Sequence, residues 1–356
     1  KLIKPYISFE EVQNEFKEVF DSGWFTKGKF VEEFREEIKN YTGSKYCYLA
    51  TSATTALTMA LKALDIKAGD EVIVAGNAYI ACVMGISMNN AVPVFCEPDE
   101  YYNIDASKIE SLISSKTKAI LAVHLYGQPC DMKSIKQICD KHKLYLVEDC
   151  AQSHGSTYDG IMTGRFSDIG CFSFYPSKNL GAFGDAGAIV TDNSELADKI
   201  RVLRNYGSEK RYYNEVVGYN SRLDELQAGL LRVKLKYLDQ LNKERIDIAK
   251  RYLREVDNPK IILPKILDKA MPIWHLFVVR VKDRAEFMSY LNECNIGSVI
   301  HYPIPPHLSK AYEYLGYKEG DYPITESYAN EVVSLPIYNG MTKEEVDYAI
   351  KCLNKY

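Results

Sequence analysis

The chain lacks the features that mark a membrane, secreted or nucleic-acid-binding protein. No apolar run among its 356 residues approaches the length of a membrane span, and the first residues, K-L-I-K-P-Y, lack the apolar region of a signal peptide. A net charge of −4 leaves no basic footprint for nucleic acid. We therefore expect a cytoplasmic protein without nucleic-acid or membrane partners, long enough for one large and one smaller domain.

Paired cysteine motifs are also missing. The nine cysteines are scattered along the chain, odd in number, and include no C-x-x-C pair. This pattern predicts buried free thiols in a reducing compartment, and neither a disulfide framework nor a zinc site. Cys150 and His154 form a conceivable metal pair, but two ligands without partners make it the less favoured interpretation, and we expect no metal.

Short apolar runs recur from residue 46 onward and are separated by segments with helical spacing. The expected strands are Tyr46–Leu49, Val72–Ala75, Val92–Phe95, Ala119–Val123 and Leu144–Val147. The expected helices are Thr55–Leu64, Ile80–Met88, Ala106–Ile113 and Met132–His142. This alternation, with no polar alternation inside the strands, predicts βαβ units and a parallel sheet covered on both faces. Ligands of such sheets bind at the carboxyl ends of the strands.

Two of the loops that follow strands carry candidate ligand-binding residues. The segment Ala50–Leu61 opens a helix with small hydroxyl residues, whose free N–H groups could bind a phosphate, although plain capping explains the same pattern. Tyr79 follows the second strand at the start of a helix. An aromatic ring there can lie flat on a planar ligand, and core packing is the alternative.

The loops after two later strands supply a carboxylate and a lysine. V-E-D-C-A-Q-S-H-G places Asp149 at the end of an apolar strand, where a carboxylate can hold a pyridinium nitrogen protonated. Lys178 follows the expected strand Cys171–Phe174 among small and aromatic residues, where desolvation lowers an amine's pKa and favours Schiff-base chemistry. Together with a phosphate site and a flat aromatic, these residues meet the requirements of pyridoxal phosphate.

Four segments carry a resemblance to a known family. They are E-D-C-A-Q-S-H-G (148–155), S-F-Y-P-S-K-N-L-G-A (173–182), G-Y-N-S-R-L-D-E-L-Q-A (218–228) and H-Y-P-I-P-P-H (301–307). In this order and spacing, and over nearly the whole chain, the sequence resembles the DegT/StrS-type sugar-nucleotide aminotransferases. The resemblance implies the α/β aspartate-aminotransferase (type I) fold, with a mostly parallel central sheet covered by helices. Residues 1–238 would form the large domain that binds pyridoxal 5'-phosphate, and residues 239–356 a smaller α+β domain.

The resemblance also assigns roles to single residues. Lys178 matches the lysine that forms the internal aldimine, and Asp149 matches the partner of the pyridine nitrogen. The other cofactor-binding matches are Thr54, Thr55 and Ser173 near the phosphate, Tyr79 on the ring, Gln152 beside the phenolic oxygen, and Asn220 reaching the neighbouring subunit's cofactor phosphate. The matches for substrate binding are Tyr175, Arg222, His301 and Tyr302. The family usually has glycine where this chain has Ala53, and alanine tolerates a positive φ poorly.

The expected activity is transamination of a nucleotide-linked keto sugar by a homodimer with shared active sites, with L-glutamate as the amino donor and ping-pong kinetics. The segment V-H-L-Y-G-Q-P (123–129) resembles the branch that aminates C3 of the hexose, which favours a dTDP-3-oxo-6-deoxyhexose. A UDP-3-oxo sugar and a 4-oxo sugar remain alternatives. A cofactor-binding regulator without turnover is a more distant one. A Rossmann-type dehydrogenase ranks low because no G-x-G-x-x-G follows any of the first strands.

Overall fold

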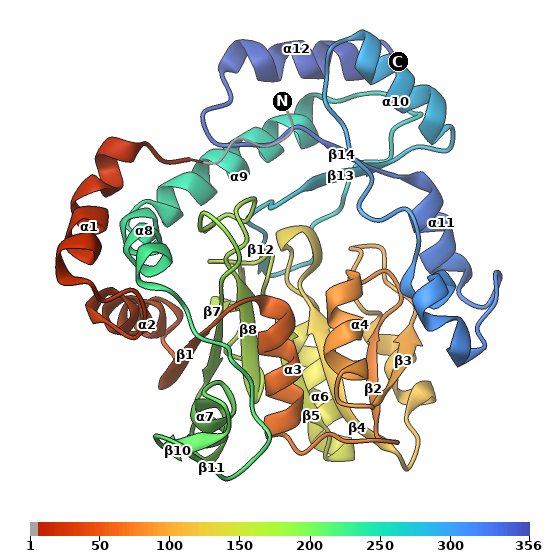
Figure 1. Ribbon diagram of the computed structural model, residues 1–356. Helices are drawn as coiled ribbons and strands as arrows, with labels where there is room; N and C mark the ends of the chain where they lie inside the picture. Colours follow the sequence, from red (N-terminus) through yellow and green to blue (C-terminus); the bar gives the residue numbers. More distant parts are fainter. Residues whose placement is uncertain (1–5) are drawn as a thin grey trace.

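A seven-stranded sheet organises the first two thirds of the chain in the computed structural model, which describes residues 6–356 (Figure 1). Its strands are β1 (Tyr46–Ala50), β2 (Glu71–Ala75), β3 (Val92–Cys96), β4 (Thr117–Val123), β5 (Tyr145–Asp149), β8 (Ile169–Ser173) and β9 (Gly187–Thr191). They lie in the order β1-β9-β8-β5-β4-β2-β3. From β8 to β3 all neighbours are parallel, whereas β9 is antiparallel to both β8 and β1. The expected mostly parallel sheet is therefore confirmed.

The position of β1 differs from a simple run of βαβ units. The first expected strand lies at one edge of the sheet beside β9, and not beside β2. Because β9 is antiparallel to both of its neighbours, β1 still points in the same direction as β8 and β5. The carboxyl ends of all strands except β9 consequently meet at one edge of the sheet, and the loops that follow them lie there.

Helices cover both faces of this sheet. They are α1 (Phe9–Ser22), α2 (Lys29–Thr42), α3 (Ala53–Ala63), α4 (Ile80–Ser87), α5 (Ala106–Ile109), α6 (Met132–His142), α7 (Ser194–Leu203) and α8 (Glu225–Leu235). Figure 1 shows α3 and α4 on one face and α6 on the other. Helix α3 is buried on nearly every side, which agrees with its run of alanine, leucine and methionine.

The last third of the chain has its own hydrophobic core, above the sheet in Figure 1. Its elements are α9 (Leu238–Glu255), β13 (Phe277–Arg280), α10 (Arg284–Glu293), α11 (Pro323–Glu331), β14 (Val332–Leu335) and α12 (Lys343–Leu353). Strands β13 and β14 pair antiparallel. Residues 297–300 make only one bridge, Val299 with Ser334. The domain boundary at residue 238 stays a prediction, and residues 1–5 of the first domain lie outside the described part.

Short elements complete the chain. They are the strands β6 (Thr157–Tyr158), β7 (Ile161–Met162), β10 (Ser208–Lys210), β11 (Tyr213–Asn214) and β12 (Ala270–Met271), and the 3₁₀ turns Glu110–Leu112, Leu125–Gly127, Pro306–Leu308 and Lys310–Leu315. All nine cysteines are free, and all except Cys294 are buried, as expected. Within residues 6–356, no helix combines the length and the apolar character needed to cross a bilayer.

Candidate active site

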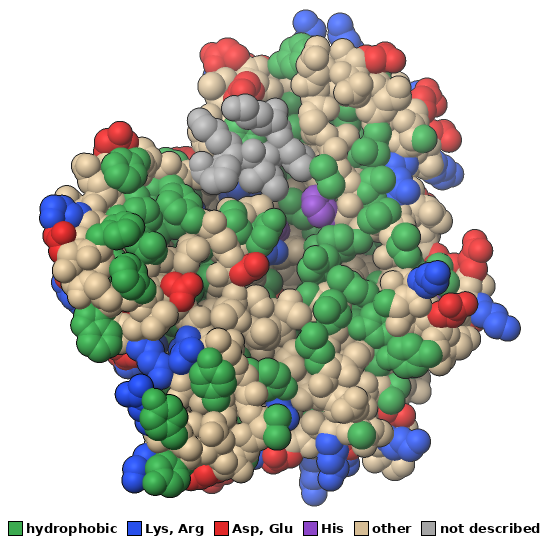
Figure 2. All heavy atoms as spheres, viewed as in Figure 1, with side chains coloured by type: hydrophobic (Ala, Val, Ile, Leu, Met, Phe, Trp, Pro, Cys, Tyr) green, Lys and Arg blue, Asp and Glu red, His purple; other side chains and the backbone are tan. Residues whose placement is uncertain are grey.

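A cavity of about 350 Å³ opens at the carboxyl edge of the sheet. Loops that follow β1, β2, β4, β5 and β8 form most of its wall, and segments from the last third of the chain close it. The predicted site residues that line it are Thr54, Tyr79, Asp149, Gln152, Ser173, Tyr175, Lys178, His301 and Tyr302. In Figure 2 the molecule is hollowed between the sheet and the last third of the chain.

Asp149 ends strand β5 and is buried. Its two carboxylate oxygens accept hydrogen bonds from the Ala151 amide (Oδ1, 2.8 Å) and the Cys82 thiol (Oδ2, 3.0 Å). No cationic side chain within residues 6–356 forms an ion pair with it. A buried carboxylate is costly without a positive partner, so this position fits a ligand that carries a protonated nitrogen.

Lys178 lies in a tight turn after β8, the strand that pairs with β5. The turn is closed by hydrogen bonds from Lys178 N to the Tyr175 carbonyl (2.8 Å) and from Ala182 N to the Phe174 carbonyl (2.7 Å). Gly181 has no room for a side chain, because a Cβ atom there would lie 2.4 Å from the Pro176 oxygen. Sequence pattern and strand order thus bring Lys178 and Asp149 to the same cavity.

The environment of Lys178 favours its neutral form. Burial lowers the pKa of its amine to about 8, although the charges of Asp149 and Cys82 act in the opposite direction. A second buried lysine, Lys234 of α8, donates to the Gly181 carbonyl at 2.6 Å and so anchors the turn. Burial also lowers the pKa of Lys234 to about 8, but Lys234 is not part of the cavity wall.

The N-terminus of α3 forms part of the cavity wall. Ser52 caps this helix by accepting from Thr55 N at 3.2 Å, and both Ala53 and Thr54 line the cavity. Ala53 is the first helical residue and has no positive φ, so alanine in place of the family's glycine creates no strain. Helix N-termini bind anions through free N–H groups and the helix dipole.

Thr55, also predicted near the phosphate, faces another way. Its hydroxyl donates to the Ser52 carbonyl at 3.0 Å and lies 3.1 Å from the Thr51 hydroxyl and 3.3 Å from the Ser221 hydroxyl. Thr55 is not part of the cavity wall. Ser173, at the end of β8, does line the cavity and accepts from Tyr175 N at 3.3 Å.

Two tyrosines, Tyr79 and Tyr302, and the side-chain amide of Gln152 form another side of the cavity. Tyr79 is 47% exposed at the mouth, with its ring 4.9 Å from that of Tyr302. The Gln152 Oε1 accepts from Tyr126 N at 2.6 Å, and its Nε2 donates to the Tyr302 hydroxyl at 3.3 Å. Because its oxygen is engaged by the backbone, Gln152 presents its N–H groups to this side of the cavity.

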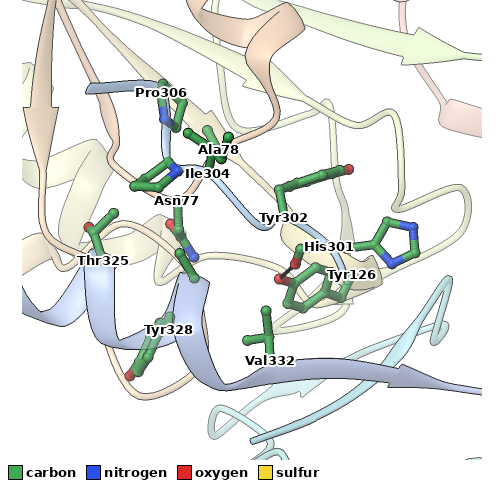
Figure 3. A pocket seen from close by; sticks show the side chains of 12 residues that line it. Asn77, Ala78, Tyr126, His301, Tyr302, Ile304, Pro306, Thr325, Tyr328 and Val332 are labelled. Atoms are coloured by element: carbon green, nitrogen blue, oxygen red, sulfur yellow. Dashed lines mark hydrogen bonds between the residues drawn. The ribbon is translucent and has the colours of Figure 1, made fainter. Parts of the chain in front are cut away.

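The segment that contains His301 and Tyr302 is fixed against the loop after β4. Figure 3 shows the Tyr126 ring beside this segment, with its hydroxyl donating to the His301 carbonyl. His301 Nδ1 lies 2.7 Å from the Ser334 hydroxyl. Burial, followed by the charge of Lys178, lowers the pKa of His301 to about 4, so its ring is neutral at physiological pH.

Besides Thr55, the predicted residues Asn220 and Arg222 lie outside this cavity in the single chain. Arg222 donates to Asn220 Oδ1 at 2.9 Å and to the Tyr206 hydroxyl at 3.3 Å, and its guanidinium lies 5.0 Å from the Tyr206 ring centre. Neither Asn220 nor Arg222 is part of the cavity wall. The role predicted for Asn220, in a neighbouring subunit's site, stays a prediction.

Cys82 and His275 are among the residues of the cavity wall that the sequence interpretation did not single out. Cys82 follows Tyr79 by three residues and lies on α4, and a cysteine among apolar residues gave no sign of its contact with Asp149. His275 precedes β13 in W-H-L-F, where one polar residue at the start of an apolar run was the available signal.

His124, Glu148 and Cys150 bring potential metal-ligand atoms within 4.8 Å of one another. The carboxylate of Glu148 is already heavily hydrogen-bonded, however. It accepts from His124 Nε2 (2.9 Å), from the amides of Gly164, Phe166 and Ser167, and from the Ser167 hydroxyl. This network fixes the turn at 164–167 and gives His124 and Glu148 a structural role.

The chain matches the model of one known family over nearly its whole length. The profile of the DegT/DnrJ/EryC1/StrS aminotransferase family matches residues 7–354. The chain is 51% identical over 348 residues to the dTDP-3-amino-3,6-dideoxy-alpha-D-galactopyranose transaminase of Aneurinibacillus thermoaerophilus, covering 98% of this chain and 95% of the relative.

Two solved structures are similar over nearly the whole chain. Streptomyces venezuelae DesV, crystallised in complex with a ketimine intermediate, has a TM-score of 0.97 and 40% identity, and the match covers 100% of this chain and 97% of DesV. Bacillus subtilis NtdA with bound cofactor PMP has a TM-score of 0.90 and 34% identity, covering 97% of this chain and 80% of NtdA.

Proposed function

The chain belongs to the DegT/DnrJ/EryC1/StrS aminotransferase family, whose members depend on pyridoxal phosphate, and from this premise we propose that it aminates a nucleotide-linked keto sugar. The proposed acceptor is a dTDP-3-oxo-6-deoxyhexose, which becomes the dTDP-3-amino-3,6-dideoxyhexose, and the proposed donor is L-glutamate. The observation that carries the proposal is the meeting of Lys178 and Asp149 in one cavity, at the ends of paired strands.

The residues of the cavity fit pyridoxal phosphate. The unpaired carboxylate of Asp149 suits the ring nitrogen, the start of α3 with Thr54 and Ser173 suits the phosphate, and Tyr79 suits a ring face. The Gln152 N–H groups suit the phenolic oxygen. When bound, the cofactor supplies an electron sink for the carbanion formed at the donor's α-carbon.

The chain's own residues account for the proton transfers. Lys178 has a pKa near working pH, so its neutral amine can take the proton from the α-carbon of the donor and, once protonated, return it. The negative charge of Asp149 would favour the protonated form of the cofactor's ring nitrogen when the cofactor is bound. The neutral ring of His301 and the hydroxyl of Tyr302 supply hydrogen-bonding groups for the sugar.

The choice of acceptor is supported by the relative with 51% identity, which is named for a dTDP-3-amino-3,6-dideoxyhexose. The choice of donor and acceptor can be tested with purified protein loaded with pyridoxal phosphate. Glutamate should bleach the yellow colour and release 2-oxoglutarate in one equivalent per site, and the acceptor sugar should restore the colour. Offering dTDP-3-oxo, dTDP-4-oxo and UDP-3-oxo sugars separately identifies the acceptor. If glutamate releases no 2-oxoglutarate, the donor assignment is wrong, and a regulator without turnover becomes the better interpretation.

A homodimer with shared active sites is part of the proposal. Asn220 and Arg222 lie together on the surface of the chain, outside its own cavity, where a second copy could receive them. Inactive Lys178→Ala and Asn220→Ala proteins should then regain activity when mixed, because one of the two sites in each heterodimer is intact. No recovery after subunit exchange has been verified by mass would contradict shared sites.

A cytoplasmic location is likewise proposed. Its support is the set of nine free cysteines, which are typical of a reducing compartment. Fractionation of the source cells with an antibody to the chain would test it, and recovery of the protein in the membrane or the medium would contradict it.

A further inference from the structure

His275 lies in the same cavity wall as Lys178 and comes from a segment that is fixed on both sides. Its side chain is only 5% exposed. Ile273 N donates to the Gly127 carbonyl at 3.0 Å, and Leu276 N donates to the Tyr126 carbonyl at 3.2 Å. The segment therefore presents His275 to the cavity from a defined position.

The backbone around His275 is also clamped from the other side. The buried guanidinium of Arg245, on α9, donates to the carbonyls of Trp274 (3.4 Å), His275 (3.3 Å) and Ile337 (3.0 Å). Trp274 has a φ of 52°, a left-handed conformation that is unfavourable for a bulky side chain. Such conformations persist only where the surroundings fix them, and they cluster at functional sites.

A chain of two buried asparagines fixes the orientation of the His275 ring. Asn242 Nδ2 donates to the His154 carbonyl at 2.7 Å, which leaves Asn242 Oδ1 to accept from Asn179 Nδ2 at 2.8 Å. Asn179 Nδ2 also donates to the Ile273 carbonyl at 3.3 Å. Exchanging the oxygen and nitrogen of either side-chain amide would therefore place two acceptor oxygens against each other. Asn179 Oδ1 therefore faces His275 Nδ1, 3.1 Å away, as an acceptor.

This chain of hydrogen bonds determines the tautomer of His275. An acceptor at Nδ1 requires the proton to be on Nδ1, which leaves Nε2 as a bare acceptor. The Nε2 atom has no hydrogen-bond partner within residues 6–356. It is not fully buried, and because His275 lines the cavity, Nε2 is accessible from it. Burial, followed by the charges of Lys178, Arg245, His154 and His301, holds the pKa of His275 well below its ordinary value.

We propose that His275 is a positioning residue whose Nε2 accepts a hydrogen bond from the Lys178 amine whenever that amine is free, and that Asn179 fixes the required tautomer. Lys178 and Asn179 are neighbours in the sequence, so a single turn supplies both the reactive amine and the group that orients its acceptor. The Lys178 amine forms no hydrogen bond with residues 6–356, and Lys178 and His275 line the same cavity. The inference rests on the proposed role of Lys178.

The tautomer is tested on the wild-type protein without cofactor. In protein labelled with ¹⁵N-histidine, the six histidines give separate ring signals, and His275→Gln identifies that of His275. The expected result is a neutral ring with its proton on Nδ1 between pH 6 and 8. A proton on Nε2 instead would overturn the inference without affecting the proposed function.

The contact with Lys178 is tested by the pH dependence of covalent cofactor attachment, which reports the pKa of the Lys178 amine. Asp149 and Cys82, whose charges also act on this amine, are unchanged in every variant. His275→Phe keeps a ring but removes the acceptor, so the pKa should fall by about one unit, the effect of one lost hydrogen bond to a charged group. His275→Gln, which retains an acceptor oxygen, should restore part of the difference.

The outcomes separate this inference from the proposed function. If the cofactor attaches to Lys178 but His275→Phe leaves the pKa unchanged, His275 has only a structural role and the inference is wrong. A lower melting temperature without a pKa change has the same meaning. If the cofactor does not attach to Lys178 even in the wild type, the proposed function itself fails. Should His275→Phe not fold, the His275→Gln comparison and the wild-type ring signals still decide the matter.

Discussion

The two sides of the cavity are built differently. On the sheet side, Asp149 and Ser173 end the paired strands β5 and β8, and Lys178 lies in the turn that follows β8. On the opposite side, the segments that carry His275 and His301 are held by side-chain hydrogen bonds from Asn179 and Tyr126. Strand register thus positions the groups proposed to react, whereas long-range polar contacts position the groups proposed to bind the sugar and to orient the lysine.

The largest expected effect comes from the sheet side. Lys178→Ala removes both the attachment point and the group that moves the proton, so kcat should fall by at least about 10⁴-fold. Steady-state assays with glutamate and the sugar acceptor measure it. Lys118→Ala, an exposed lysine on β4, is the matched control and should leave kcat unchanged. Multiple turnovers by Lys178→Ala would contradict the assignment.

The next effect is a dependence on pH. Lys178 has a folded-state pKa of about 8, below its ordinary value, and only its neutral form can attack. At pH 6 about one amine in a hundred is neutral, so the rate of covalent cofactor attachment should rise about 50-fold from pH 6 to pH 8 and level off above. Stopped-flow absorbance measures this rate. A pH-independent rate would show that the attacking amine has a different pKa.

Asp149→Asn should have a smaller effect, on retention of the cofactor. The amide keeps the shape and can still accept from Ala151 N, but it removes the negative charge. Loss of one charge-assisted hydrogen bond corresponds to about 10- to 100-fold weaker binding. Dialysis followed by absorbance measures the affinity, and Asp159→Asn, in a surface ion pair with Lys269, is the control. Equal retention by both variants would mean that Asp149 does not contact the cofactor.

The smallest effect is expected on the opposite side of the cavity. Tyr126→Phe removes only the hydroxyl that holds the His301 carbonyl, so the KM for the sugar should rise about fivefold while the KM for glutamate stays the same. Comparing the two half-reactions separates these constants. A fall in kcat for both half-reactions would contradict the proposed difference between the two sides of the cavity. The side that carries His301 would then position the reacting groups as well.

The sequence predicted the sheet side well because its signals are local. Apolar runs and the loops that follow them are enough to place Asp149 and Lys178 at one edge of the sheet. The position of β1 beside β9 was not predicted, since one antiparallel strand leaves no trace in the apolar pattern. The break between α8, which ends at Leu235, and α9, which begins at Leu238, was not predicted either, because no glycine or proline lies between them.

The opposite side could not be predicted in the same way because its contacts span long distances in sequence. Asn179 and Asn242 are 63 residues apart, and Asn179 and His275 are 96 residues apart. An asparagine in a loop and another in a helix each have ordinary local explanations. Only packing of α9 against the lysine turn brings them together, which explains why His275 was missed.

The measurement that tests the central claim most directly is to identify the residue that carries the cofactor. The protein is loaded with pyridoxal phosphate, borohydride fixes any covalent link, and the digested peptides are weighed by mass spectrometry. The account predicts that the added mass lies on Lys178 and not on Lys234, although burial lowers the pKa of both amines to about 8. Added mass on Lys234 or another lysine, or on none, would contradict it.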